Sequence, residues 1–396
     1  MVSSLFKGIG IIVDDELESS DPKKNIHQIV SQIKEKEIPF LSYSSIPKGN
    51  VLNHFQNVSF ILLDWRFDKI EEIEGVTMPD ALGKEETKEN IEFIHKIKET
   101  CFCPIFIFSN ENIEDITSEL AEEGLVKGAN TDHIFVKSKA DLVGETKLFD
   151  SIETWIKSNA SVYLLKEWER EYFKAKNKLF LDFYKMNPSW PSILWKTFSE
   201  DGVNESLELG ELISRNIHTR MTPFEFSKDV ISTDIVHSQE ELLAVLEGGR
   251  FTKSENLHEN DISPGDIFKC GKKYYVNVRA ICDCVPDRSK VGETIDDVKL
   301  YLIRGSIMKP KDLDESYNSG LGLFLEKDSQ FIAYPIMDRK GIDFRFRNLE
   351  LVTWKDVKGK RIGRLLPPFI NRLQQKYALY SQRQGLPRLP SLSFPE

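Results

Sequence analysis

The chain has 396 residues, which is long enough for two or three domains. Its side chains are 40% hydrophobic and 29% charged, as in globular proteins, and this composition excludes the fibrous and intrinsically disordered classes. The formal net charge of −10 is unevenly spread, because residues 338–396 carry 13 Lys and Arg against 5 Asp and Glu. Five cysteines, with two Cys-x-Cys pairs among them, indicate neither a disulfide framework nor a usual zinc spacing. The first residues hold one lysine and a short apolar run before acids begin, so we expect no signal peptide, no membrane helix and a cytoplasmic protein.

The N-terminal segment alternates buried strands with amphipathic helices. Residues 8–16, GIGIIVDDE, predict a strand that ends on two adjacent aspartates, and the isoleucine spacing after Asp-Pro predicts a helix over 21–37. Further along the chain the same reasoning predicts strands within 40–47, 58–67, 103–112 and 133–141, and helices within 89–99, 115–124 and 148–158. This alternation predicts an α/β fold, a doubly wound parallel five-stranded sheet over residues 1–158.

Polar side chains stand at the carboxyl ends of these predicted strands, where ligands of open α/β sheets gather. They are Asp14 and Asp15 after the first strand, Asp64 after the third, Ser109 after the fourth and Lys137 at the end of the fifth. Two adjacent carboxylates repel each other unless solvent or a cation separates them, and Mg²⁺ prefers oxygen ligands. The sequence therefore predicts a magnesium site at this edge.

The order of these motifs resembles the receiver domain of bacterial two-component response regulators, which is flavodoxin-like in fold. The resemblance implies that Asp64 accepts a phosphoryl group from a histidine kinase, and that Asp14, Asp15, Asp64 and the backbone carbonyl of Arg66 hold Mg²⁺. It also implies that Ser109 and Lys137 stabilise the phosphoryl oxygens. Mg²⁺ and the lysine would offset the negative charge that opposes attack by a carboxylate.

Three features depart from the family pattern. The acidic stretch 68–90 between Asp64 and Ser109 is unusually long and could form a flap; Ser138 stands where receivers usually carry proline, and Ile134 stands at the aromatic switch position. These departures leave two alternatives open. The pocket could belong to a degenerate receiver that acts as a constitutive binding scaffold, or the acids could be solvated loop ends.

Residues 159–248 are predicted to form a helical linker region. A long helix over 161–186 continues from the first domain as a linker or as a dimerising helix, and the second alternative would give a homodimer. Further helices are expected over 204–220 and within 237–249. His218 and His237 lie in these segments, and lone histidines on such helices are more often structural than sites of phosphotransfer.

Residues 249–396 are predicted to form a mostly β domain with a terminal helix. Short runs with alternating β-branched and aromatic residues predict a small antiparallel barrel over 250–355, and a Pro-started helix follows over 367–383. The opening Pro-Gly-Asp-Ile resembles the SH3-like barrel of MazF and PemK toxins, but a matching catalytic arginine and hydroxyl pair is not found. Ribonuclease activity is therefore not transferred, and we expect no enzyme beyond receiver phosphorylation chemistry.

The basic C-terminal segment is the candidate contact surface for a partner. Its residues are Arg345 and Arg347, which alternate with phenylalanines on one predicted strand face, and Lys358, Lys360, Arg361 and Arg364, which are expected in a loop. They could grip nucleic acid phosphates, or they could dock on the acidic remainder of the same chain or on a partner protein. The domain plan is similar to that of response-receiver proteins in bacterial conflict and phage-defence loci. That similarity implies a histidine-kinase-like ATPase as partner, and a nucleic-acid-binding or nuclease effector as an alternative function.

Overall fold

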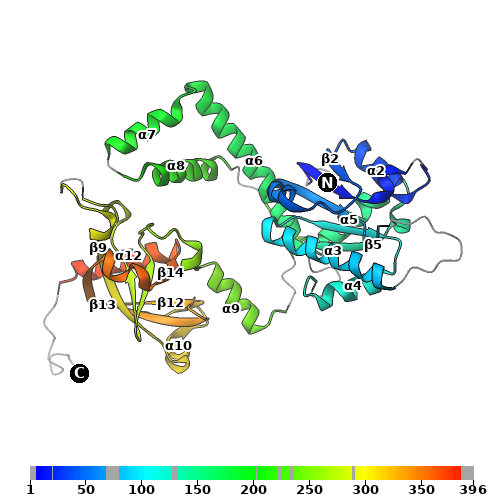
Figure 1. Cartoon of the computed structure of the whole chain (residues 1–396). Coiled ribbons are helices and arrows are strands. Elements are labelled where there is room, and N and C mark those ends of the chain that lie inside the picture. Colours follow the sequence, from blue (N-terminus) through cyan, green and yellow to red (C-terminus); the bar gives the residue numbers. More distant parts are fainter. Residues whose placement is uncertain are drawn as a thin grey trace. The chain divides into compact units, whose positions relative to one another are not determined.

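A computed structural model of the chain describes residues 6–19, 21–67, 80–126, 133–201, 203–221, 225–231, 236–287 and 290–384 (Figure 1). The chain divides into two compact units, which are described separately. The first comprises residues 1–198 and 204–234, and the second comprises residues 199–203 and 235–396.

The first unit contains a five-stranded parallel sheet with the strand order β2-β1-β3-β4-β5. Its strands are β1 (Ile9–Val13), β2 (Phe40–Tyr43), β3 (Val58–Leu63), β4 (Ile105–Ser109) and β5 (Ile134–Ser138). Gly10 of β1 leaves room for the ring of Phe60, because a Cβ atom there would lie 2.2 Å from the Phe60 Cζ atom. The predicted parallel α/β sheet is confirmed.

Helices cover both faces of this sheet, because alternate side chains of each strand point to opposite faces. Helices α2 (Asn25–Glu35) and α5 (Lys147–Lys157) pack on the face that carries Ile12, Leu62 and Phe106. Helices α3 (Asp80–Thr100) and α4 (Ile113–Glu122), with the 3-10 segment η2 (Gly49–Asn57), pack on the face that carries Ile61 and Ile107. The central strands β1, β3 and β4 are apolar on both sides for this reason.

Most of the acidic stretch that we expected to form a flap lies outside the described residues. Residues 68–79 are not described, and α3 begins at Asp80, nine residues before the start predicted for this helix. The short segments that flank the strand ends are η1 (Asp15–Glu18) after β1 and η3 (Lys139–Leu142) after β5.

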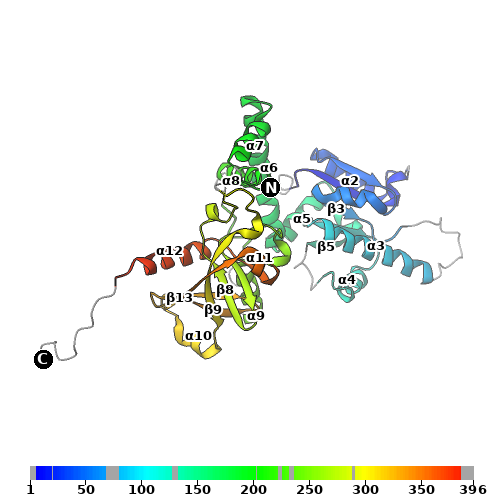
Figure 2. The ribbon, with the colours of Figure 1, turned by 60° about the vertical axis from the view of Figure 1, so that its left-hand side comes forward.

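Helices α6, α7 and α8 follow the sheet within the first unit (Figures 1 and 2). Helix α6 (Ala160–Met186) starts against α5, and a Pro-containing turn separates it from α7 (Trp190–Glu200). Helix α8 (Glu205–Arg220) returns to α6, where Ile217 packs against Ala175 and Leu179. The predicted helical region is confirmed.

The second unit is built on a seven-stranded antiparallel sheet with the order β12-β13-β9-β8-β7-β14-β6. Its strands are β6 (Phe251–Lys253), β7 (Asp266–Cys270), β8 (Lys273–Asn277), β9 (Lys299–Ile307), β12 (Gln330–Ile336), β13 (Lys340–Thr353) and β14 (Arg361–Leu365), and the hairpin β10 (Tyr317–Asn318) and β11 (Leu323–Phe324) stands apart. The helices are α9 (Gln239–Gly248), α10 (Pro310–Ser316), α11 (Trp354–Val357) and α12 (Phe369–Gln382). The short 3-10 segments are η4 (Ser254–Asn256), η5 (Ile281–Asp283), η6 (Ile295–Asp297) and η7 (Lys358–Lys360).

The predicted antiparallel β domain is confirmed in outline, with one correction at its end. Residues 361–365 form strand β14 between β7 and β6, although we expected a loop there. The sequence of this strand, RIGRL, contains only two apolar side chains beside a glycine and two arginines. The alternation of apolar residues that predicts a strand is therefore weak here. The terminal helix predicted over 367–383 is present as α12.

Candidate metal and phosphoryl site

Two central strands bring Asp14 and Asp64 together. Val13 and Leu63 are partners in the register of β1 and β3, so the residue that follows each strand emerges at the same edge of the sheet. The Asp64 backbone N–H donates to the Val13 carbonyl at 2.9 Å, which fixes this arrangement. Both aspartates are buried, at 0% and 4% exposure. The strand order reverses between β1 and β3, and this is the point where open α/β sheets bind ligands.

A buried lysine neutralises part of this acidic pair. Lys139 begins η3, directly after β5, and its side chain is 1% exposed. The Lys139 Nζ atom lies 2.5 Å from Asp64 Oδ2 and 2.8 Å from Asp14 Oδ2. Glu16 contributes a third carboxylate, 3.5 Å from the same ammonium, and Glu16 also accepts a hydrogen bond from Lys24. Sequence reasoning missed Lys139 and Glu16.

The expected position of Lys137 is corrected by this geometry. The Lys137 ammonium pairs with Asp141 Oδ2 at 3.2 Å, and both side chains are well exposed, at 39% and 58%. Strand β5 runs to Ser138, so Lys137 is still within the strand, whereas Lys139 is the first residue of the following turn. The sequence offers two lysines two residues apart, and the end of the strand decides which one reaches the pocket.

Burial and charge act on these groups in opposite directions. Burial, together with the charge of Asp14, raises the pKa of Asp64 to about 7, although Lys139 opposes the shift. Burial also raises the pKa of Asp14. For Lys139, burial disfavours the ammonium, but the carboxylates of Asp64 and Asp14 outweigh it and raise the pKa. Glu16 is also buried in part, yet its bond to Lys24 and the charge of Lys139 leave its pKa lowered.

Three carboxylates in the described part of the chain could hold a metal ion together. One oxygen from each of Asp14, Asp15 and Asp64 lies within 4.8 Å of the other two. Asp14, Glu16 and Asp64 pair with the buried ammonium of Lys139, Glu16 also pairs with Lys24, and Asp15 lies in the same cluster, so four carboxyl groups stand against two ammonium groups. Clustered carboxylate oxygens and excess negative charge fit a hard divalent cation.

The other predicted site residues lie next to this cluster. Ser109 ends β4, the strand beside β3, and is 1% exposed; its hydroxyl accepts from the Glu111 N–H at 3.2 Å. The Arg66 backbone N–H points to Asp64 Oδ1 at 3.4 Å, while its guanidinium pairs with Glu111. The loop after Asp64 is held by buried Asn90, whose amide donates to the Trp65 carbonyl at 2.6 Å.

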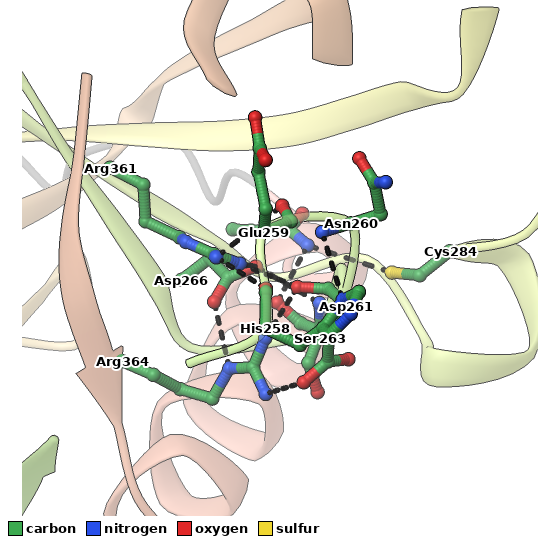
Figure 3. A network of polar contacts seen from close by, with 10 residues as sticks. His258, Glu259, Asn260, Asp261, Ser263, Asp266, Cys284, Arg361 and Arg364 are labelled. Carbon is green, nitrogen blue, oxygen red and sulfur yellow. Dashed lines mark hydrogen bonds and ion pairs between the residues drawn. The ribbon is translucent and has the colours of Figure 1, made fainter. Parts of the chain in front are cut away.

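Two of the six basic C-terminal residues lie inside the second unit (Figure 3). Arg361 has a side chain that is 3% exposed, and it donates to the carbonyls of His258, Glu259 and Asp261. Arg364 pairs with Asp266 and Asp261, both at 2.7 Å. Both arginines therefore anchor the loop before β7. This corrects the expectation that they contact nucleic acid or a partner, and it agrees with the alternative that they dock on acidic groups of the same chain.

The remaining four basic residues lie at the surface and differ in their partners. Arg345 pairs with Asp343 at 2.9 Å, and Lys358 pairs with Asp296 at 2.9 Å. Lys360 donates to the Asp356 carbonyl. In the described part of the chain no ion pair involves Arg347, which is exposed. The surface left for an anionic partner is thus smaller than the sequence suggested.

No family model matches this chain, and no curated protein matches its sequence. None of the described helices combines the length and the apolar character that crossing a membrane requires.

Proposed function

We propose that residues 1–158 form a receiver domain, flavodoxin-like in fold, that accepts a phosphoryl group on Asp64. The observation that carries this proposal is the meeting of Asp14, Asp64 and Lys139 in one pocket at the edge where strands β1 and β3 end. A nucleophilic carboxylate, a cation-binding pair and a buried ammonium are the groups that aspartyl phosphorylation needs. Lys139 takes the role that the sequence assigned to Lys137.

Each residue has a separate task in this proposal. An Asp64 oxygen forms a bond to phosphorus while the bond between phosphorus and the donor's leaving group breaks. Lys139 holds positive charge beside that oxygen and so offsets the charge of the incoming group. Ser109 offers its hydroxyl from the adjacent strand. Mg²⁺, held by Asp14, Asp15, Asp64 and the carbonyl of Arg66, would neutralise the phosphoryl oxygens.

The partners follow from this chemistry. The phosphoryl donor would be a histidine kinase or a histidine-kinase-like ATPase, and the response would reach the C-terminal β domain. Nucleic acid remains a candidate ligand for the exposed positions Arg345 and Arg347, which alternate with buried Phe344 and Phe346 on β13.

A second candidate function is a constitutive binding scaffold. Two observations favour this scaffold function. Asp64 is only 4% exposed, and the Lys139 ammonium already pairs with both Asp14 and Asp64. A receiver that never accepts phosphate would gain stability from this internal neutralisation.

Incubation with Mg²⁺ and acetyl phosphate, followed by intact-mass measurement, separates the two functions. A gain of one phosphoryl group that is lost in Asp64→Asn supports the receiver. A wild-type protein that gains no phosphoryl group, with acetyl phosphate or with a cognate kinase, contradicts the proposal and leaves the scaffold.

A further inference from the structure

Helices α6, α7 and α8 expose an unusual number of large apolar side chains within the first unit. We call these residues the α6–α8 surface: Phe173, Phe180, Leu181, Tyr184, Ile193, Trp195 and Leu207. Their exposure ranges from 36% for Phe173 to 62% for Tyr184. Single exposed apolar residues are ordinary, but exposed aromatic residues that recur along consecutive helices are typical of a surface that binds another molecule.

Helix α7 gives the clearest sign of a missing partner. Its sequence, WPSILWKTFSE, contains two tryptophans and three other apolar residues, yet none of its residues is buried. Trp190 packs against Phe180 and Phe183 at the end of α6, with ring centroids 5.7 and 4.8 Å away. Ile193 and Trp195, further along the helix, remain 52% and 44% exposed. A helix with this composition normally buries one face.

Two blocks of opposite charge accompany these apolar side chains. Residues 172–199 contain five lysines and one aspartate, whereas residues 200–211 contain five acidic residues and neither lysine nor arginine. Within the described residues no ion pair joins Lys178 or Lys185 of α6 to Glu205 or Glu208 of α8. These two lysines and two glutamates therefore keep charge available for a partner.

We propose that this surface binds a second copy of the same chain. In a two-fold dimer each contact occurs twice, so the basic end of α6 in one copy would meet the acidic start of α8 in the other, and the reverse pair would form as well. Opposite charges beside an apolar patch make the surface complementary to itself. The aromatic residues of α6 and α7 would fill the centre of the interface, and the charged residues would form its rim.

The molar mass in solution tests whether the dimer forms. Light scattering coupled to size-exclusion chromatography should give twice the 45.7 kDa mass of one chain for the wild type. Phe180→Asp and Trp195→Asp should each raise the dissociation constant at least about 30-fold, as loss of a central aromatic anchor does. Leu351→Asp, at an exposed position on β13, is the matched control and should leave the dimer intact. Circular dichroism verifies that each variant is folded.

Charge exchange tests whether the partner is a second copy and whether the two blocks meet. A Lys178→Glu, Lys185→Glu variant carries two acidic blocks, and a Glu205→Lys, Glu208→Lys variant carries two basic blocks. Each variant alone should be monomeric, because like charges then face each other, whereas an equimolar mixture should form a mixed dimer.

Three results would overturn the proposal. The first is a monomeric wild type, which would leave the surface for a different protein. The second is a dimer that survives both Phe180→Asp and Trp195→Asp. The third is a mixture of the two charge variants that remains monomeric while both are folded.

Discussion

The Nζ atom of Lys139 lies 2.5 Å from Asp64 Oδ2, whereas Lys137, two residues earlier, turns to Asp141 at the surface. The difference arises where β5 ends, because Lys139 opens a 3-10 turn that carries its side chain over the carboxyl edge of the sheet. The ammonium of Lys139 is almost fully buried between carboxylates from β1 and β3. It is the internal counter-ion of the candidate site.

Lys139→Met should lower the free energy of unfolding by about 3–5 kcal/mol, because it leaves buried carboxylates without their ion pair. Lys137→Met is the matched control, since its partner Asp141 is exposed, and it should change stability by about 0.5 kcal/mol or less. Urea unfolding followed by tryptophan fluorescence measures both. Equal effects of the two substitutions would contradict the placement of Lys139.

The sequence predicted the sheet and most of the pocket because both depend on local patterns. Near-continuous apolar runs identify strands buried on both faces, and the acids after β1 and β3 end these runs abruptly. The choice between Lys137 and Lys139 could not be made in this way. Which lysine reaches the pocket depends on the residue at which β5 ends. The exact end of a strand is the least certain part of a prediction from sequence.

The C-terminal unit shows a different limit. The sequence predicts Arg361 and Arg364 in a loop, because they belong to a short basic segment that contains glycine. They lie within the fold because Asp266 and the carbonyls of residues 258–261, about 100 positions away in the sequence, supply acceptors. Ion pairs between residues far apart in the sequence cannot be predicted from a local pattern. The sequence therefore predicted more basic side chains free to bind a partner than the structure shows.

Arg361→Ala should destabilise the second unit by about 3 kcal/mol, because several buried carbonyls and Asp266 lose their cationic donor. Arg347→Ala, at an exposed position without an ion pair in the described residues, should change stability by about 0.5 kcal/mol or less. Thermal unfolding monitored by circular dichroism compares the variants. An Arg361→Ala protein as stable as the wild type would contradict the role of Arg361 as an anchor.

Asp15→Asn should abolish divalent cation binding, which in the wild type is expected in the high-micromolar to millimolar range of sites that retain several waters. Trp65 reports on the site, because it is buried next to Asp64 and its indole N–H donates to Glu119. Asp141→Asn is the control outside the cluster and should bind Mg²⁺ as the wild type does. Unchanged Mg²⁺ affinity in Asp15→Asn would move the cation elsewhere.

The affinity for Mg²⁺ should rise with pH up to the pKa of Asp64, about 7, and level off above it, because a cation must displace the proton from this carboxyl group. The contribution of Asp64 to the free energy of unfolding should fall as pH rises, whereas the Mg²⁺ affinity rises. An unfolded aspartate has a pKa of about 3.9, so between this value and about 7 the folded state binds more protons. The contribution of Asp64 to stability therefore falls as pH rises through this window.

Asp64→Asn removes the contribution of Asp64 to both effects, whereas Asp14, whose pKa is also raised by burial, still contributes in this variant. Titrations of Mg²⁺ at a series of pH values, and urea unfolding at the same values, compare the variant with the wild type. If Mg²⁺ affinity and stability depend on pH in the same way in the wild type and in Asp64→Asn, a group other than Asp64 controls this dependence.

The central claim, that Asp64 carries the phosphoryl group, is tested most directly by locating the modified residue. After incubation with Mg²⁺ and acetyl phosphate, borohydride reduces an aspartyl phosphate to homoserine, which peptide mass mapping identifies by position. We expect homoserine at position 64 in the wild type and in Lys137→Ala, and a strong reduction of this signal in Lys139→Ala. A modification at another residue, or none in the wild type, would contradict it.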